Sequence, residues 1–119
     1  MNKFIIPIEL CDLNTYVYAE RTNRLIAAGI KKRMNAQIGY FCKKLELEDV
    51  QYDVEIIWTT QDRRKDSDNI FFGVKFILDA LIKAGKLKGD GYRYVRNISH
   101  KREIGTQKTE VTFIEVKND

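Results

Sequence analysis

The chain has 119 residues, 44% hydrophobic and 32% charged, which suits one domain with a core of its own rather than a disordered segment. No apolar run is long enough to cross a membrane, and Cys11 and Cys42 lack the spacing of a metal-binding or redox pair. The start, MNKFIIPIEL, has no small-residue cleavage site of a signal peptide. We therefore expect a cytoplasmic protein with reduced thiols.

The net charge of +4 is distributed unevenly along the chain. Residues 1–59 are balanced, and residues 103–119 are net negative. Residues 60–102 hold 11 Lys and Arg against five Asp, a net charge of +6. A basic segment attracts polyanions such as nucleic acids, and a merely solvated surface is the alternative explanation for this charge.

The first half of the chain predicts one strand and one long helix. Residues 3–10 are rich in β-formers, with Pro7 favouring the strand's end or an edge position, and residues 11–14 read as a turn. Apolar residues recur at helical spacing over 15–45, and Gly29 is the weak point at which this helix could split in two.

The second half predicts a strand, a helix and a hairpin. Residues 50–60 alternate, with Trp58 at the end of the buried face. Residues 70–84 form an amphipathic helix that Ser67 or Asp68 would cap and Gly85 would end. Strands over 92–101 and 108–117 follow, joined by a turn at 103–106.

These elements predict the fold class α/β (α+β), with a mixed sheet, helices packed on it and the order β-α-β-α-β-β. The sequence has no repeats, low-complexity tracts or linkers, so residues 1–119 should form a single domain.

Acidic residues gather inside the basic segment. Asp66 and Asp68 are two apart, and helical spacing places Asp68, Lys75 and Asp79 on one face. Asp90 comes from the loop after that helix. Three carboxylates close together repel one another unless a cation such as Mg²⁺ (or Mn²⁺) binds them, although a helix cap beside a solvated acid is the plainer explanation.

Such a metal site would suit phosphodiester hydrolysis. The ion polarises a phosphoryl oxygen and lowers the pKa of a bound water, while Lys75 stabilises the charge that builds up or helps to deprotonate the water. Asn69 would hold the helix start or orient Asp68. Asp79 would orient Lys75, or simply pair with Lys75 or Lys83 four residues away.

The stretch from Arg64 to Asp90, RKDSDNIFFGVKFILDALIKAGKLKGD, resembles the signature of the RusA family of Holliday-junction resolvases. Residues 66 and 68 match the paired aspartates, Lys75 the helix lysine, Asp79 the aspartate of D-A-L and Asp90 the second acid of the loop. The sequence departs from the pattern in two places: about one extra helical turn separates Asp68 from Lys75, and Gly89 replaces the first acid of the loop.

The resemblance implies a Mg²⁺-dependent endodeoxyribonuclease of phage or prophage type, acting in DNA recombination and repair without an organic cofactor or a membrane partner. It also implies a homodimer that nicks four-way DNA junctions symmetrically, which suits the twofold symmetry of the junction. The metal ligands would be Asp66, Asp68 and Asp90, with Lys75 as a further catalytic residue. The residues expected to contact DNA phosphates are basic: Arg63, Arg64, Lys65, Lys86, Lys88, Arg93 and Arg96.

Two other functions remain open. One is a non-catalytic protein that binds branched or structured nucleic acid, with the acids as structural caps. The other is a catalytic dimer that acts mainly on forks, flaps or other branched DNA. Among the aromatic residues, we expect Trp58 in the core, Tyr92 or Tyr94 along a DNA groove or dimer interface, and the single histidine, His100, at the surface.

Overall fold

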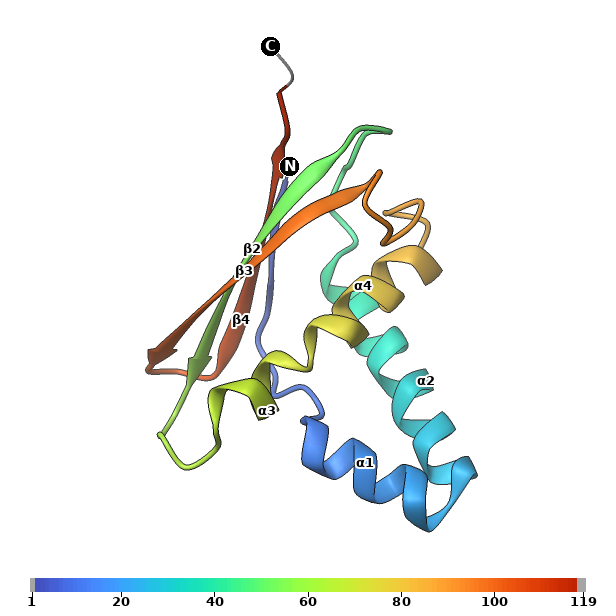
Figure 1. The fold of residues 1–119 in the computed structure, drawn as a ribbon, viewed down its shortest axis with the longest axis vertical. Coiled ribbons are helices and arrows are strands. Elements are labelled where there is room, and N and C mark those ends of the chain that lie inside the picture. The colour runs from blue at the N-terminus through green and yellow to red at the C-terminus, as the bar shows by residue number, and fades with distance from the viewer. Residues whose placement is uncertain (1, 118–119) are drawn as a thin grey trace.

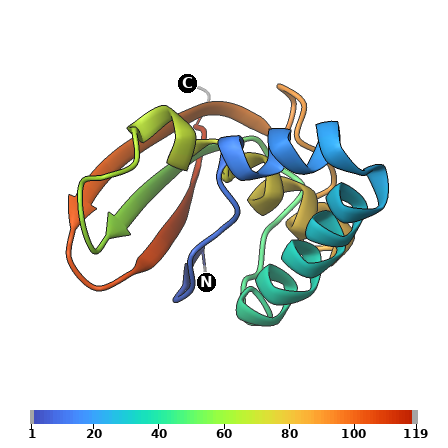
Figure 2. The same cartoon turned by 90° about the horizontal axis from the view of Figure 1, so that it is seen from below.

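The computed structural model describes residues 2–117, and its sheet carries all of its helices on one side (Figures 1 and 2). The strands lie in the order β1-β4-β2-β3. The elements in chain order are β1 (Lys3–Ile6), α1 (Leu13–Thr22), α2 (Arg24–Phe41), β2 (Tyr52–Thr60), α3 (Ser67–Phe71), α4 (Val74–Lys83), β3 (Val95–Ile104) and β4 (Lys108–Glu115). The expected α+β class with a mixed sheet is confirmed. The expected order is corrected, because each predicted helix is two helices and the order is β-α-α-β-α-α-β-β.

The central strand β2 has an antiparallel neighbour on one side and a parallel neighbour on the other. Val54 pairs with Phe113 of antiparallel β4, and Ile56 pairs with His100 of parallel β3. A parallel pair needs a crossover connection, which α3 and α4 supply. The segment that follows β2 and the segment that precedes β3 therefore lie at opposite ends of these strands.

Alternation along the strands fills the core between sheet and helices. Tyr52, Val54, Ile56 and Trp58 are all buried, whereas Glu55 between them is exposed. The core position expected for Trp58 is thus confirmed, at 2% exposure. No helix in the described part of the chain is both long and apolar enough to cross a membrane.

The first long helix divides at Asn23, not at Gly29. The backbone of Asn23 is extended, and its side-chain oxygen accepts a hydrogen bond of 2.8 Å from the amide of Leu25. An asparagine in this position caps the helix that follows it. The start of α1 is capped in the same way, since Asp12 accepts a hydrogen bond of 2.8 Å from the amide of Thr15.

The second predicted helix also divides, at Phe72 and Gly73. The chain tightens there, because the amide of Gly73 bonds to the oxygen of Ile70, three residues back. A Cβ atom on residue 73 would lie 3.0 Å from the Trp58 ring and 3.3 Å from the Ile70 oxygen. The absence of a side chain therefore lets this turn pack directly against Trp58.

Gly85 ends α4, as the sequence predicted. Its φ of +74° lies in the left-handed region that residues with a Cβ atom rarely adopt, and the amides of Lys86 and Leu87 bond back to the oxygen of Leu81. The next strand begins three residues later than expected, at Val95, because residues 91–94 form a turn in which the Val95 amide bonds to the oxygen of Gly91.

Two glycine replacements should shift stability in opposite directions. Gly85→Ala should destabilise the protein by about 1 kcal/mol, because alanine disfavours a positive φ. Gly29→Ala should stabilise it by about 0.5–1 kcal/mol, since Gly29 lies within α2 and an added Cβ atom would meet nothing within 4 Å beyond its chain neighbours and the backbone of its own helix. Urea unfolding of the two variants beside the parent measures both shifts, and a stabilising Gly85→Ala would contradict the capping role.

Candidate functional site

The acidic motif, here residues 66–68, follows the loop after β2. Residues 61–66 form a loop, Asp66 is the N-cap of α3, and Asp68 lies in its first turn. Both aspartates are exposed. The Asp66 side chain makes no capping hydrogen bond, and the Asp68 carboxylate accepts only from the adjacent Asn69 amide, at 2.9 Å. The Asp66 carboxylate is therefore not engaged at the helix start, and Asp68 uses one of its two oxygens there.

The three aspartates predicted as metal ligands differ from the other described aspartates because they form no ion pair. Asp119 lies outside the described residues, and five of the remaining eight pair with Lys or Arg: Asp12, Asp49, Asp53, Asp62 and Asp79. Within residues 2–117, the three that form no ion pair are Asp66, Asp68 and Asp90. These are the three predicted as metal ligands, and their charges are available to an external cation.

Asp90, however, lies far from the other two. It belongs to the loop before β3, where neighbouring Lys88 contacts Asp49 at 2.9 Å beside the start of β2. Asp66 follows the other end of β2, a nine-residue strand, and a strand of that length spans about 26 Å. The fold does not bring Asp90 to Asp66 and Asp68 within one chain.

A metal ion would therefore have at most two carboxylate ligands from this motif. Among the described residues, no group of three or more His, Cys, Asp or Glu side chains is placed to hold a metal. Mg²⁺ commonly binds through one or two carboxylates, with water and substrate phosphate oxygens completing its coordination. The pair Asp66 and Asp68 fits that pattern, whereas an ion that needs a cage of protein ligands would not fit.

The other residues of the predicted site have defined partners. Lys75 and Asp79 form an i, i+4 ion pair of 3.8 Å on α4, the simpler of the alternatives considered for Asp79. Because the helix breaks at Gly73, the shared helical face expected for Asp68 and Lys75 does not run unbroken between them. Asn69 is buried, and its side-chain oxygen accepts from the Asn14 amide at 2.9 Å, so it joins α3 to the start of α1.

Most of the predicted DNA contacts are engaged within the protein. Lys88 and Arg93 share Asp49, Arg96 makes a bidentate pair with Asp53, and Lys86 donates to a backbone oxygen of residue 43. Arg64 pairs with Asp62 and Lys65 with Asp12 and Glu9. Of the seven, only Arg63 makes no ion pair or side-chain hydrogen bond within residues 2–117. Exposed pairs can open to accept a phosphate, but their charge is partly neutralised.

Lys65 links the motif to the start of α1. Its ammonium lies 2.6 Å from the carboxylate of Asp12, which is buried. Burial alone would raise the pKa of Asp12, but hydrogen bonds from Lys65 and Thr15 outweigh that effect and lower the pKa below its ordinary value. Lys65 is thus a structural residue, whatever else it contacts.

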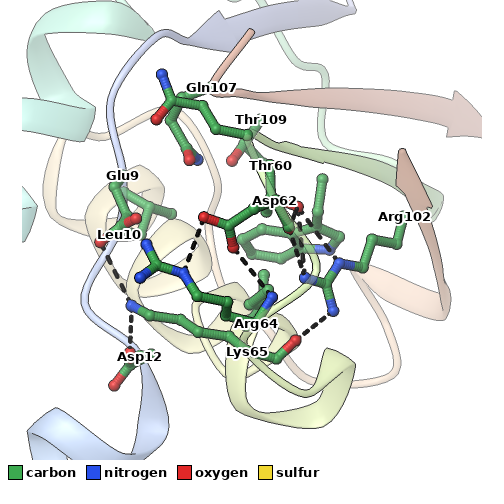
Figure 3. Close-up of a pocket in the computed structure, with 13 residues that line it drawn as sticks. Glu9, Leu10, Asp12, Thr60, Asp62, Arg64, Lys65, Arg102, Gln107 and Thr109 are labelled. Atoms are coloured by element: carbon green, nitrogen blue, oxygen red, sulfur yellow. Dashed lines mark hydrogen bonds and ion pairs between the residues drawn. The ribbon is translucent and has the colours of Figure 1, made fainter. Parts of the chain in front are cut away.

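A cavity of about 400 Å³, here called the Trp58 cavity, opens beside the motif (Figure 3). It is lined by Glu9, Leu10, Asp12, Trp58, Thr60, Gln61, Asp62, Arg64, Lys65, Ile70, Arg102, Gln107 and Thr109. Sequence reasoning missed this cavity, because its walls come from segments far apart in the chain. One wall residue could have been found from the sequence. Strand alternation places Arg102 on the same face of β3 as His100, and this face lies toward the helices.

Arg102 of β3 holds the loop between β2 and α3. Its guanidinium donates to the backbone oxygens of Lys65 and Asp62 (Figure 3). It also donates to the Ser67 hydroxyl. These bonds join β3 to residues on both sides of Asp66. The loop is therefore positioned by a neighbouring strand as well as by Lys65.

His100 packs beneath the motif rather than at the surface. The Trp58 indole N–H donates to His100 Nδ1 at 2.9 Å, and the imidazole stacks on the Phe71 ring with centroids 4.6 Å apart. The surface position expected for His100 is corrected to a half-buried one, because the inner face of β3 turns it toward α3. Tyr92 is exposed and Tyr94 half-buried. The prediction that one of them lines a DNA groove or a dimer interface stays a prediction.

Comparisons with known proteins add no relative. A scan of the chain against protein-family models found no match, and a search of curated proteins found none either. The resemblance of residues 64–90 therefore stays a prediction from the sequence.

Acidification should weaken the packing of His100. Burial lowers its pKa below the ordinary 6.5, and Nδ1 must stay unprotonated to accept from Trp58. The unfolded chain therefore takes up the proton first, so stability is complete above about pH 6.5 and falls as pH drops toward the folded pKa. Urea unfolding at pH 7.5 and 5.5, followed by Trp58 fluorescence, measures this loss.

The variant His100→Gln is the control, since it keeps an acceptor and cannot titrate. The chain has one histidine, so the pH dependence between 7.5 and 5.5 should be smaller in the variant. An equal pH dependence in both proteins would mean that His100 is not the group responsible.

Replacing Lys65 tests the ion pair with Asp12. Lys65→Met should lower stability at pH 7 by about 1–2 kcal/mol, less than for a fully buried pair because Lys65 is partly exposed. The Asp12 contribution is present above its ordinary pKa of 3.8 and is lost as pH falls through the lower folded pKa, so the difference should narrow in acid. Lys101→Met, at a residue without an ion pair in the described chain, should change stability little.

Proposed function

We propose that this protein is a Mg²⁺-dependent endonuclease of the cytoplasm that hydrolyses phosphodiester bonds in branched DNA, four-way junctions in particular. The observation that supports this most is that Asp66 and Asp68 form no ion pair within residues 2–117, whereas the other described aspartates, except Asp90, all do. Free carboxylates in a net basic segment suit a substrate that arrives with its own phosphates and a cation.

Each part of the motif has a role in this proposal. Asp66 and Asp68 would hold Mg²⁺, which supplies a polarised phosphoryl oxygen and a water of lowered pKa. Arg63, exposed and unpaired within residues 2–117, is available to contact a neighbouring phosphate. Lys65 and Arg102 keep the loop before Asp66 in place, so that the two carboxylates are presented from a fixed position.

A homodimer belongs to the proposal, on the strength of the resemblance to resolvases. Two symmetric cuts in a junction require two sites related by a twofold axis, which one copy of this chain does not provide. In such a dimer, Asp90 would either work apart from Asp66 and Asp68 of its own chain or lie beside the acidic motif of the other protomer.

The second candidate is a protein that binds branched nucleic acid without cutting it. The distance between Asp90 and the motif favours this candidate, because it leaves two carboxylates where a nuclease often has three. The idea that the acids serve as helix caps is a separate part of this candidate. The structure does not favour it for Asp66, whose side chain makes no capping hydrogen bond.

Cleavage of a labelled synthetic four-way junction separates the two candidates. We expect paired nicks that require Mg²⁺ and fall by at least about 100-fold in Asp66→Asn, since that variant loses a metal ligand but keeps the fold. Junction binding, measured by gel shift without metal, should be retained by the variant.

Glu55→Gln is the matched control, because it removes the same charge from an exposed position on β2. It should cleave like the parent. Binding without cleavage in Mg²⁺ or Mn²⁺ would exclude the nuclease, and forks or flaps tested in parallel would show whether four-way junctions are the preferred substrate.

A further inference from the structure

The Trp58 cavity lies directly against the acidic motif. Lys65, one residue before Asp66, forms part of its wall (Figure 3). Ile70, two residues after Asp68, forms another part. Its volume of about 400 Å³ is within the range of small-molecule sites. A group bound there would lie beside whatever Asp66 and Asp68 act on.

The charged residues of the cavity are balanced among themselves. Three acids and three bases line it, and Lys65 pairs with Asp12 and Glu9 while Arg64 pairs with Asp62 at 3.0 Å. The remaining base, Arg102, donates to backbone oxygens. No net positive charge is left in the cavity to hold a phosphate, so its ligand should be neutral.

The uncharged lining has both apolar and polar surface. Leu10, Trp58 and Ile70 line it with apolar atoms, those of Trp58 almost fully buried. Gln61 and Gln107 contribute amide groups, which can donate and accept hydrogen bonds. Apolar walls with a few polar groups suit a flat, neutral ring whose edge carries donors and acceptors, which is the chemistry of a nucleobase.

We propose that the Trp58 cavity takes up one unstacked nucleobase of the bound DNA strand. This inference rests on the proposed function, because it requires a chain that binds branched DNA. Bases at a branch point or in an unpaired stretch leave the stack at lower cost than bases inside a duplex, so the cavity selects for such positions. Capture of the base positions the adjoining backbone beside Asp66 and Asp68.

Binding without cleavage tests the cavity apart from the chemistry. The Asp66→Asn protein, without Mg²⁺, is titrated with three labelled duplexes: one with a single unpaired base, one with an abasic site at that position, and one fully paired. We expect the unpaired base to tighten binding about tenfold over the abasic probe. It should also change the fluorescence of Trp58, the only tryptophan.

Filling the cavity should remove that preference. Gln107→Phe in the same background adds bulk to the lining, and we expect it to bind the unpaired-base and abasic probes equally. Asn35→Phe replaces an amide with the same ring on α2, at a residue that lines neither this cavity nor the adjoining one, and should keep the tenfold preference. Circular dichroism and urea unfolding verify that both variants fold.

Each other outcome counts against the inference. Equal binding of the unpaired-base and abasic probes overturns the cavity's role and leaves the proposed function intact, as does a preference that survives Gln107→Phe. If free nucleosides alter Trp58 fluorescence while those two probes bind equally, the ligand is a free nucleoside and not a DNA strand. Failure to bind any of the DNA probes or a four-way junction overturns the proposed function and this inference together.

Discussion

The parallel pairing of β2 with β3 is the constraint on which the arrangement of this protein depends. It obliges the chain to cross from one end of the sheet to the other, and α3 and α4 make that crossing over the buried face. Residues after β2 and residues before β3 are consequently held apart. The motif at Asp66 thus shares its end of the sheet with the Trp58 cavity, while Asp90 lies at the other end with the pairs around Asp49.

Some charged side chains of this protein form ion pairs within the chain, and the others have no charged partner among the described residues. Lys88 with Asp49 and Arg96 with Asp53 are pairs between residues about forty positions apart, so they hold the turn before β3 to the beginning of β2. Lys65 does the same at the other end, between the motif and α1. Much of the positive charge of residues 60–102 therefore stabilises the fold itself, and fewer cations face an incoming polyanion than the net charge suggests.

The features that sequence predicted well are those that depend on neighbours in the chain. The alternation around Trp58 predicts β2, and Gly85 predicts the end of α4, because strand periodicity and left-handed backbone are local properties. The break at Asn23 is also local, but the low helix propensity of Gly29 obscures it in the sequence. The stacking of His100 on Phe71 and the walls of the Trp58 cavity depend on register between distant strands, which no local pattern specifies.

Gly73 lies between the acidic motif and the core, and it packs against the core residue Trp58. Its missing side chain lets the turn between α3 and α4 rest on the Trp58 ring, whose N–H is fixed by His100. Asp68 lies five residues earlier on the same short, continuous piece of backbone, so contact at residue 73 determines how far α3 stands from the sheet. A side chain introduced there would press on the Trp58 ring and the Ile70 oxygen, so the junction of α3 and α4 would have to shift although no residue of the motif is altered.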